Sequence, residues 1–329
     1  MVRTGSADLR QDGGLLTARR FFVIFNPASG RGRGGKRIDA YRALLDKALG
    51  DVTYGATTRA GEERDLAERA VDDGYDVIVA VGGDGTWSNV ADRLVASGRE
   101  DVVLGILPSG TGNDFGRNFG YDPRNPAEAV RVLAEGHTRP IDVGCVDTLS
   151  ASEHHPDRWE SRHFLNLIGF GFDIAVIDAA KGARFLRGEL LYKITALQQL
   201  FRFSGLHARI EPASGGAREQ HHLMLTVSNG RYFGGGFPIA PDATVDDGRL
   251  HACLIGDAPG LTRMKLFNAA ERGQHVASPL VEMVDDKAFR LSFREAPRFE
   301  MDGDVRTSET EVVEVRSIPG ALRVLAPAP

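Results

Sequence analysis

Strand-length apolar runs alternate with amphipathic segments in the first part of the chain, and this alternation restricts the fold more than any other feature. Three runs, 21–25 (FFVIF), 76–81 (DVIVAV) and 101–107 (DVVLGIL), are apolar almost throughout, and 51–58 (DVTYGATT) is typical of a further strand. Strands without a polar face are buried on both sides, as in parallel sheets that helices cover. We therefore expect an N-terminal α/β domain built on a parallel sheet.

The pattern changes near residue 140. Runs that alternate between apolar and polar residues then dominate, for example 206–210, and helical patterns occur only near 188–203 and 261–273. Short alternating strands at this density are typical of an antiparallel β-sandwich. The predicted fold class is therefore α/β plus β, with the parallel domain over 20–140 and the antiparallel sandwich over 141–329. This prediction leaves open that the last strands return to the first domain.

Composition excludes several classes of protein. The net charge of -5 disfavours a nucleic-acid partner, which needs a basic surface. Two cysteines, Cys145 and Cys253, are too few for a disulfide scaffold, and no apolar stretch approaches the roughly 18–20 residues of a membrane span. Residues 1–19 carry acidic side chains and no apolar core, so we expect a disordered leader rather than a secretory signal. We expect a cytoplasmic protein, for which any contact with lipid would be peripheral.

A glycine-rich segment, 26–37 (NPASGRGRGGKR), follows the first predicted strand. It nearly matches the dinucleotide pattern G-x-G-x-x-G, but the second strand lacks the acidic residue that would bind the ribose. It also nearly matches the P-loop, but Arg37 stands where Ser or Thr binds magnesium. What remains is a turn fixed by Pro27, with free backbone N–H groups near Ser29 and Gly30 before a helix, which suits a phosphate group. A plain glycine turn is the alternative.

Two more segments of this kind follow the later strands. In 82–86 (GGDGT), Asp84 puts a carboxylate at the carboxyl end of a parallel strand, where ligands of open α/β sheets bind. A carboxylate beside phosphates requires a cation, so Asp84 indicates Mg²⁺. In 108–115 (PSGTGNDF), glycines and hydroxyls again precede a carboxylate, Asp114. Helix caps, with Thr86 in the first segment, are the alternatives, but three such segments at one sheet edge favour a phosphate site.

These segments resemble the diacylglycerol kinase catalytic family in its soluble bacterial lipid-kinase branch. That branch shares its nucleotide domain with sphingosine kinases and, more distantly, with NAD kinases. The family's first nucleotide loop, its GGDGT signature and its P-x-GTxND segment are similar to 26–30, 82–86 and 108–114. Later segments extend the resemblance over about 20–325 and favour a lipid kinase over an NAD kinase: 166–174, 229–250 and 299–304.

The resemblance implies an NAD kinase-like first domain and an ATP site in the cleft between the two domains. By position, it assigns fifteen residues to ATP: Asn26, Pro27, Ala28, Ser29, Gly30, Arg31, Thr58, Gly82, Gly83, Asp84, Gly85, Thr86, Trp87, Ser88 and Thr111. Arg31 departs from the Lys that relatives often carry here. Arginine keeps the charge and adds a planar fork that can bind phosphate in a bidentate way.

The resemblance also implies two magnesium sites and a catalytic base. Asp84 and Asp114 would hold the catalytic Mg²⁺. A structural Mg²⁺ would lie in the sandwich, with ligands from three residues: Thr244, Asp247 and Arg249. From the residues alone, 246–248 (DDG) indicates only a turn, with a cation site as the alternative.

The base would come from 301–304 (MDGD). Asp302 occupies the place of the family's general base in a D-G-E triplet, but Asp304 replaces the glutamate and is one methylene shorter. Either Asp302 or Asp304 can therefore meet the acceptor hydroxyl. From the residues alone, a tight Asp-Gly-Asp turn indicates only a hairpin.

The implied reaction transfers the ATP γ-phosphoryl group to a lipid hydroxyl, first of all that of diacylglycerol, giving phosphatidic acid. Sphingoid bases, ceramide and phosphatidylglycerol are alternative acceptors, and an NAD kinase or a non-catalytic binding protein are alternative functions. A lipid acceptor implies transient contact with the inner face of the membrane. Apolar residues near basic ones, such as Phe201 with Arg202 and Phe233 with Arg231, are candidates for this contact, with burial in the core as the alternative. An exposed sandwich edge leaves a homodimer open.

Overall fold

The computed structural model describes residues 19–27, 34–120, 125–150, 158–182 and 189–328. Residues 1–18 of the predicted leader, and Ala28, Ser29, Gly30 and Arg31 of the first predicted phosphate segment, lie outside the described residues.

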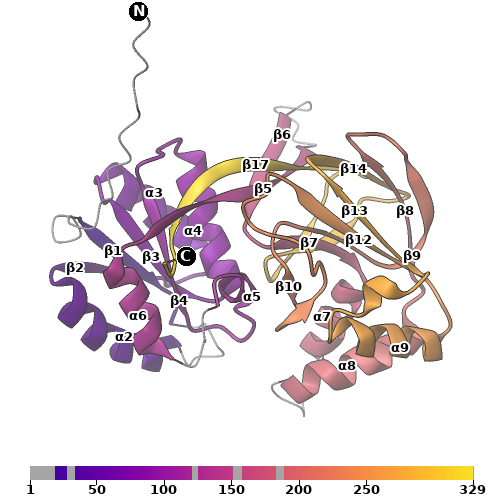
Figure 1. Cartoon of the computed structure of the whole chain (residues 1–329), viewed down its shortest axis with the longest axis horizontal. Helices are drawn as coiled ribbons and strands as arrows, with labels where there is room; N and C mark the ends of the chain where they lie inside the picture. The colour runs from indigo at the N-terminus through magenta and orange to yellow at the C-terminus, as the bar shows by residue number, and fades with distance from the viewer. Residues whose placement is uncertain (1–18, 28–33, 121–124, 151–157, 183–188, 329) are drawn as a thin grey trace, which may run out of the picture.

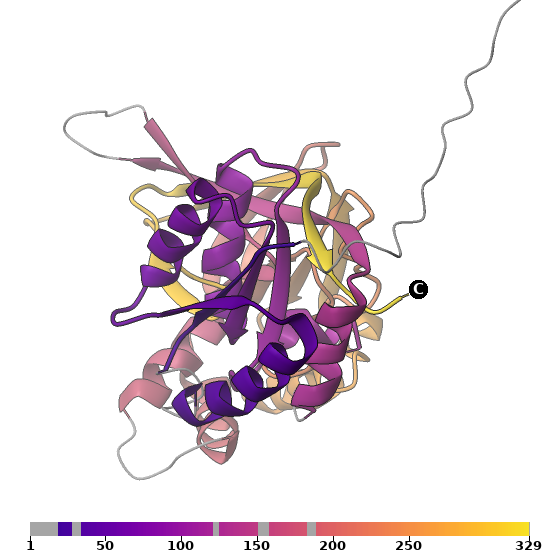
Figure 2. The same cartoon turned by 90° about the vertical axis from the view of Figure 1, so that its left-hand side faces the viewer.

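The N-terminal part is a parallel sheet between two layers of helices, as the apolar runs predict (Figures 1 and 2). Its strands lie in the order β4-β3-β1-β2: β1 (Phe21–Phe25), β2 (Val52–Ala56), β3 (Val77–Gly82) and β4 (Val103–Pro108). Every residue of β3 and β4 is buried, which explains their continuous apolar sequence. The helices pair, α3 beside α4 and α2 beside α6: α2 (Gly34–Leu49), α3 (Glu62–Asp72), α4 (Asp84–Ala96), α5 (Asp114–Arg117) and α6 (Pro126–Glu135).

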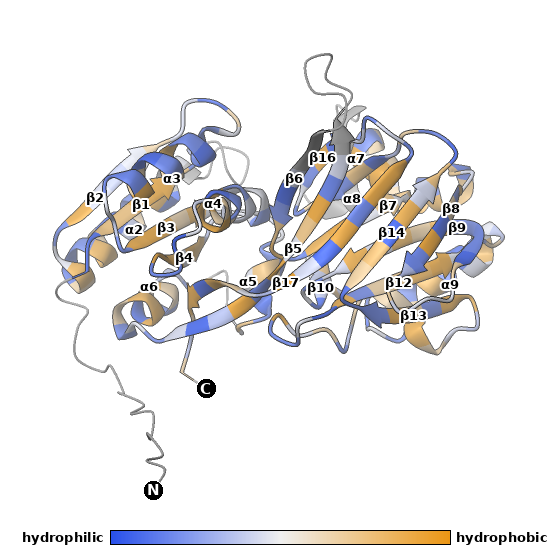
Figure 3. Cartoon of the chain, turned by 90° about the horizontal axis from the view of Figure 1, so that it is seen from above, coloured by the Kyte–Doolittle hydropathy of each residue, from blue (hydrophilic) through white to orange (hydrophobic). Residues whose placement is uncertain are grey.

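The C-terminal part is an antiparallel β-sandwich, as the alternating runs predict. Hydrophobic and hydrophilic residues alternate along strands such as β5 and β17 (Figure 3). The strands are β5 (Thr138–Ser150), β6 (Arg158–Phe164), β7 (Leu167–Gly171), β8 (Leu206–Pro212), β9 (Arg218–Ser228), β12 (Leu250–Gly256), β13 (Val281–Asp286), β14 (Ala288–Phe293), β15 (Arg298–Met301), β16 (Asp304–Thr307) and β17 (Val312–Leu325). A separate two-stranded sheet is formed by β10 (Tyr232–Phe233) and β11 (Phe237–Pro238).

Three helices cover one face of this sandwich: α7 (Phe172–Gly182), α8 (Glu189–Arg202) and α9 (Gly260–Ala270). A core of apolar residues that includes Phe170, Leu225 and Phe289 fills the sandwich, and a second core that includes Phe172 and Leu200 lies under the helices. No helix in the described part of the chain combines the length and the apolar character that crossing a bilayer requires.

The last strand joins the two parts. β17 runs antiparallel to β5 over most of its length, and its end pairs in parallel with β4 at Arg323–Val103 and Val324–Leu104. The parallel sheet and the sandwich therefore share one continuous sheet, and the chain crosses between them twice, on β5 and on β17 (Figure 1).

Candidate functional site

The described parts of the three predicted phosphate segments lie at one edge of the parallel sheet, because β1, β3 and β4 run in the same direction. The backbone N–H groups of Ser109 and Gly110 donate to the Gly82 carbonyl at 2.7 and 3.0 Å, and the Asn26 N–H donates to the Val81 carbonyl at 3.3 Å. A Cβ on Gly110 would lie 2.5 Å from the Cα of Gly83. The glycines therefore let two loops approach more closely than any side chain permits.

Asp84 and Asp114 lie side by side at this edge. A Cβ on Gly112 would lie 3.1 Å from Asp84 Oδ2 and 3.4 Å from Asp114 Oδ2. The Phe115 N–H donates to Asp84 Oδ1 at 2.9 Å, while Asp114 Oδ1 is buried, accepts no hydrogen bond and forms an ion pair with Arg117 Nε at 3.4 Å. Burial raises the pKa of Asp84, and burial together with Asp84 raises the pKa of Asp114 to about 7.

Two adjacent buried carboxyl groups that repel each other suit a divalent cation. The described residues contain no cluster of three or more metal-ligating side chains. A magnesium ion here would therefore take its other ligands from phosphate oxygens and water, as Mg²⁺ does in phosphoryl-transfer sites.

The 232–236 segment, an apolar loop that the sequence offers as the preferred candidate for lipid contact, reaches the same place from the second domain. The Gly235 N–H donates to Asp114 Oδ2 at 2.8 Å, and α5 lies beside β10 (Figure 1). The glycine run at 234–236 is the signal that points to such a close approach, since all three glycines have positive φ.

The turn between β15 and β16 also faces the parallel sheet. Asp302 has φ 47° and is buried, and its carboxylate accepts three backbone N–H bonds, from Leu165 (2.6 Å), Asn166 (3.0 Å) and Leu167 (2.9 Å). Burial raises its pKa to about 6. Asp304 is exposed instead, and a Cβ on Gly85 would lie 3.4 Å from its Oδ1. The structure therefore brings the turn that carries both carboxylates to the 82–86 loop, and Asp304 is the more exposed of the two.

Several residues assigned to ATP by resemblance contact protein groups. The Asn26 amide donates to Glu63 Oε1 at 3.0 Å, and the Thr58 N–H and hydroxyl donate to Glu62 Oε2. Thr86 is buried directly beneath Gly82. These contacts stabilise the loops.

The remaining assigned side chains differ in exposure. Ser88 is buried, and its hydroxyl donates to the His163 carbonyl at 3.4 Å and acts to lower the pKa of the Asp302 carboxyl. Thr111 is exposed at the sheet edge.

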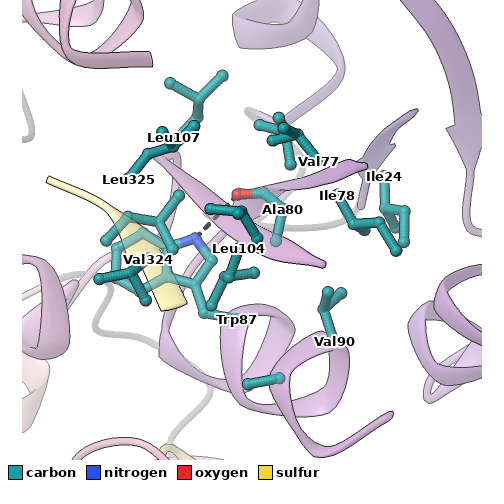
Figure 4. Close-up of a cluster of buried hydrophobic side chains, with 14 of the residues drawn as sticks. Ile24, Val77, Ile78, Ala80, Trp87, Val90, Leu104, Leu107, Val324 and Leu325 are labelled. Carbon is teal, nitrogen blue, oxygen red and sulfur yellow. Dashed lines mark hydrogen bonds between the residues drawn. The ribbon is translucent and has the colours of Figure 1, made fainter. Parts of the chain in front are cut away.

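Trp87 is a correction to the predicted ATP site. Its side chain is 0% exposed and lies in the core with Leu104, Leu107 and Val324, and its Nε1–H donates to the Ala80 carbonyl at 3.0 Å (Figure 4). Its backbone N–H already donates to the Gly83 carbonyl. The prediction was wrong because position after a motif does not tell which face of α4 a residue occupies.

The turn predicted to hold a structural magnesium is far from the 82–86 loop in the sequence. It packs against β5, the strand that connects the two domains. Thr244 is exposed, Asp247 accepts the Arg249 N–H at 2.9 Å, and the Arg249 side chain pairs with Asp285. Sequence reasoning missed Asp142, whose carboxylate accepts the N–H groups of Gly248 and Gly320. The alternating run 141–145 puts Asp142 at a polar position of the strand, so no signal in the sequence marks this carboxylate as buried.

Comparison with known proteins follows the same division. Residues 20–146 match the family model of the diacylglycerol kinase catalytic domain, and residues 166–326 match that of the YegS C-terminal NAD kinase beta sandwich-like domain. A diacylglycerol kinase of Mycobacterium tuberculosis (strain ATCC 25618 / H37Rv) is 30% identical over 318 residues, which cover 97% of each chain. One of Staphylococcus carnosus (strain TM300) is 26% identical over 288 residues, covering 87% of this chain and 89% of the relative.

The fold is also shared with a solved structure. The crystal structure of a diacylglycerol kinase from Bacillus anthracis str. Sterne superimposes with a TM-score of 0.67 at 20% identity, over 94% of this chain and 97% of that one. These findings confirm the resemblance and the fold that it implies. The chain therefore belongs to the diacylglycerol kinase family and is a lipid kinase, a phosphotransferase with an alcohol group as acceptor.

Proposed function

We propose that the protein transfers the γ-phosphoryl group of ATP to the free hydroxyl of diacylglycerol, giving phosphatidic acid. The observation that carries the proposal is the meeting of two acidic groups from different domains at the 82–86 loop: the Asp84–Asp114 pair and the Asp302–Asp304 turn. The names of the relatives support diacylglycerol as the acceptor.

The parallel domain would bind the phosphates of ATP. Phosphoryl transfer depends mainly on positioning and on neutralising charge, and the glycine loops that meet at Gly83 and Gly110 would position the phosphates. Asp84 and Asp114 would hold a magnesium ion, which when bound neutralises charge on the phosphate oxygens.

The sandwich would supply the group that receives the hydroxyl proton. Since the oxygens of Asp302 already accept three backbone N–H bonds, we assign proton acceptance to Asp304 and positioning of the turn to Asp302. The Asp304 carboxylate must come within about 3 Å of the hydroxyl in the closed complex.

A lipid substrate also requires a surface that meets the membrane. The side chains of Leu197 and Phe201 on α8 and of Leu261 on α9 are 47%, 57% and 67% exposed. The Phe201 ring covers Gly260, so the two helices present these residues together, beside the exposed Arg202 and Lys265. Apolar side chains with cations at their border suit peripheral contact with an anionic bilayer.

The proposal is tested by phosphoryl transfer from labelled ATP in Mg²⁺, with diacylglycerol, a sphingoid base, ceramide and phosphatidylglycerol in mixed micelles and with NAD as a soluble acceptor. We expect labelled phosphatidic acid, reduced by about 10²-fold or more in Asp84→Asn and Asp304→Asn. The exposed Asp242→Asn is the matched control and should behave as wild type.

Each other outcome has a clear meaning. If the label appears on a different lipid, that lipid and not diacylglycerol is the acceptor. Label on NAD, or on none of the acceptors, would overturn the proposal. Full activity in Asp304→Asn with loss in Asp302→Asn would move the base to Asp302.

A further inference from the structure

Two carboxyl groups that no proposed step uses lie buried beneath the Asp302–Asp304 turn. Asp173 belongs to the first turn of α7 and Glu300 to β15, and they are 5% and 4% exposed. Glu300 pairs in register with Gly169 of β7. A Cβ on Gly169 would overlap Asp173 Oδ2 and lie 3.7 Å from Glu300 Oε2, so both oxygens surround one point that only a glycine leaves open.

Neither group has a partner that balances its charge. Both oxygens of Asp173 and Oε2 of Glu300 are buried without a hydrogen bond. The charged groups that act on Glu300 besides Asp173 are acidic, Asp302 and Asp84, and Arg298 at the start of β15 pairs with Asp178. Two ionised carboxylates side by side in the interior, with no cation, cost far more than a pair that keeps one proton.

We propose that Asp173 and Glu300 share one proton and thereby hold the turn that carries Asp302 and Asp304. The N-terminal turn of α7 favours the negative charge on Asp173, so the proton resides on Glu300. Glu300 Oε2–H then donates to Asp173, and Glu300 Oε1 accepts the Gly303 N–H. This arrangement gives a hydrogen-bond partner to Glu300 Oε2 and to Asp173. It also fixes Gly303, the middle residue of the turn, to the buried Glu300 side chain.

The titration behaviour of both groups supports the geometry. Burial raises the pKa of Asp173 to about 7. Burial, with Asp173 and then Asp302 as like charges, raises the pKa of Glu300 well above its usual range. The folded protein therefore keeps a proton that the unfolded chain releases, and its stability falls as the pH rises above the ordinary range of a glutamate.

Glu300→Gln tests the proposal, because the glutamine amide can accept the Gly303 N–H and donate to Asp173 without titrating. We measure urea unfolding between pH 5 and pH 8. The ratio of the wild-type to the variant folding constant should fall with rising pH, by up to about tenfold per pH unit for one retained proton. Glu295→Gln, which removes an exposed glutamate before β15, is the control and should keep the wild-type slope. A wild-type slope in Glu300→Gln would overturn the proposal.

The positioning role, which rests on the proposed function of the turn, has its own readout. We expect Glu300→Gln to keep the wild-type kcat near pH 7 and to retain activity at higher pH than wild type. Glu300→Leu, which cannot accept the Gly303 N–H, should lose kcat while remaining folded. A Glu300→Gln variant that folds but is inactive at every pH would overturn the positioning role. Because the unfolding experiment needs no acceptor lipid, its result is independent of the identity of the substrate.

Discussion

The backbones of Gly83 and Gly110 approach each other closely in the candidate site, and Gly110→Ala probes this approach directly. The Cβ of an alanine at 110 would lie 2.5 Å from the Cα of Gly83. Carbon atoms in contact lie about 3.5–4.0 Å apart, so the two loops must separate by about 1 Å. No rotamer change can relieve this overlap, since one partner is backbone and the other is a methyl group.

The structure predicts two separate magnitudes for this variant. Overpacking of this kind costs about 1–3 kcal/mol of stability, which a domain of ordinary stability tolerates. A displacement of about 1 Å between the loops that position the phosphates should lower kcat/KM for ATP by about 10²-fold. We therefore expect a folded protein with a large catalytic defect.

The assay compares kcat/KM for ATP at saturating acceptor with the free energy of unfolding in urea. Gly98→Ala, just beyond the C-terminal end of α4, is the matched control: its positive φ of 68° gives an alanine there a stability cost, but a Cβ meets nothing within 4 Å, so activity should be unchanged. If Gly110→Ala keeps kcat/KM for ATP within about threefold of wild type, the argument that this approach positions the phosphates is refuted.

Three further changes test other parts of the structure. Burial lowers the pKa of His222 to about 4, so the folded chain binds fewer protons than the unfolded chain between about pH 4 and 6.5. The free energy of unfolding should therefore fall by up to about 3 kcal/mol as the pH drops through this window. Urea unfolding of His222→Leu should lack this loss. Trp87→Leu should cost about 3 kcal/mol of unfolding free energy, while calorimetry on the folded variant finds unchanged ATP affinity. Asp92 on α4 binds Arg64 and, across the domain boundary, the His163 N–H at 2.8 Å, so Asp92→Asn should lower the unfolding free energy by about 2 kcal/mol in thermal melts.

Much of the fold follows from local sequence. Continuous apolar runs such as 77–82 become strands buried on both faces, and alternating runs become sandwich strands, because these patterns match the two environments residue by residue. The glycine segments after β3 and β4 predict one binding edge for the same reason: strands that run in parallel end on the same side.

Within the site, the sequence predicts which residues gather but not how each side chain is used. Asp84 and Asp114 meet as expected. The assignment of Trp87 to ATP fails because a motif fixes the position of a residue on a helix and not its direction, and here the apolar ring is more stable in the core. The choice between Asp302 and Asp304 depends on the amides of 165–167, which no local pattern connects to the turn.

The sequence by itself thus determines the two fold types, the binding edge and the family, because each depends on neighbouring residues or on short motifs. The tertiary structure decides what depends on segments far apart in the chain. It joins β17 to β4, brings Gly235 to Asp114, closes the amides of 165–167 around Asp302, and buries Asp173 against Glu300. The physical reason is that burial removes polar groups from water, and the groups that can then pair with them lie on segments distant in the sequence.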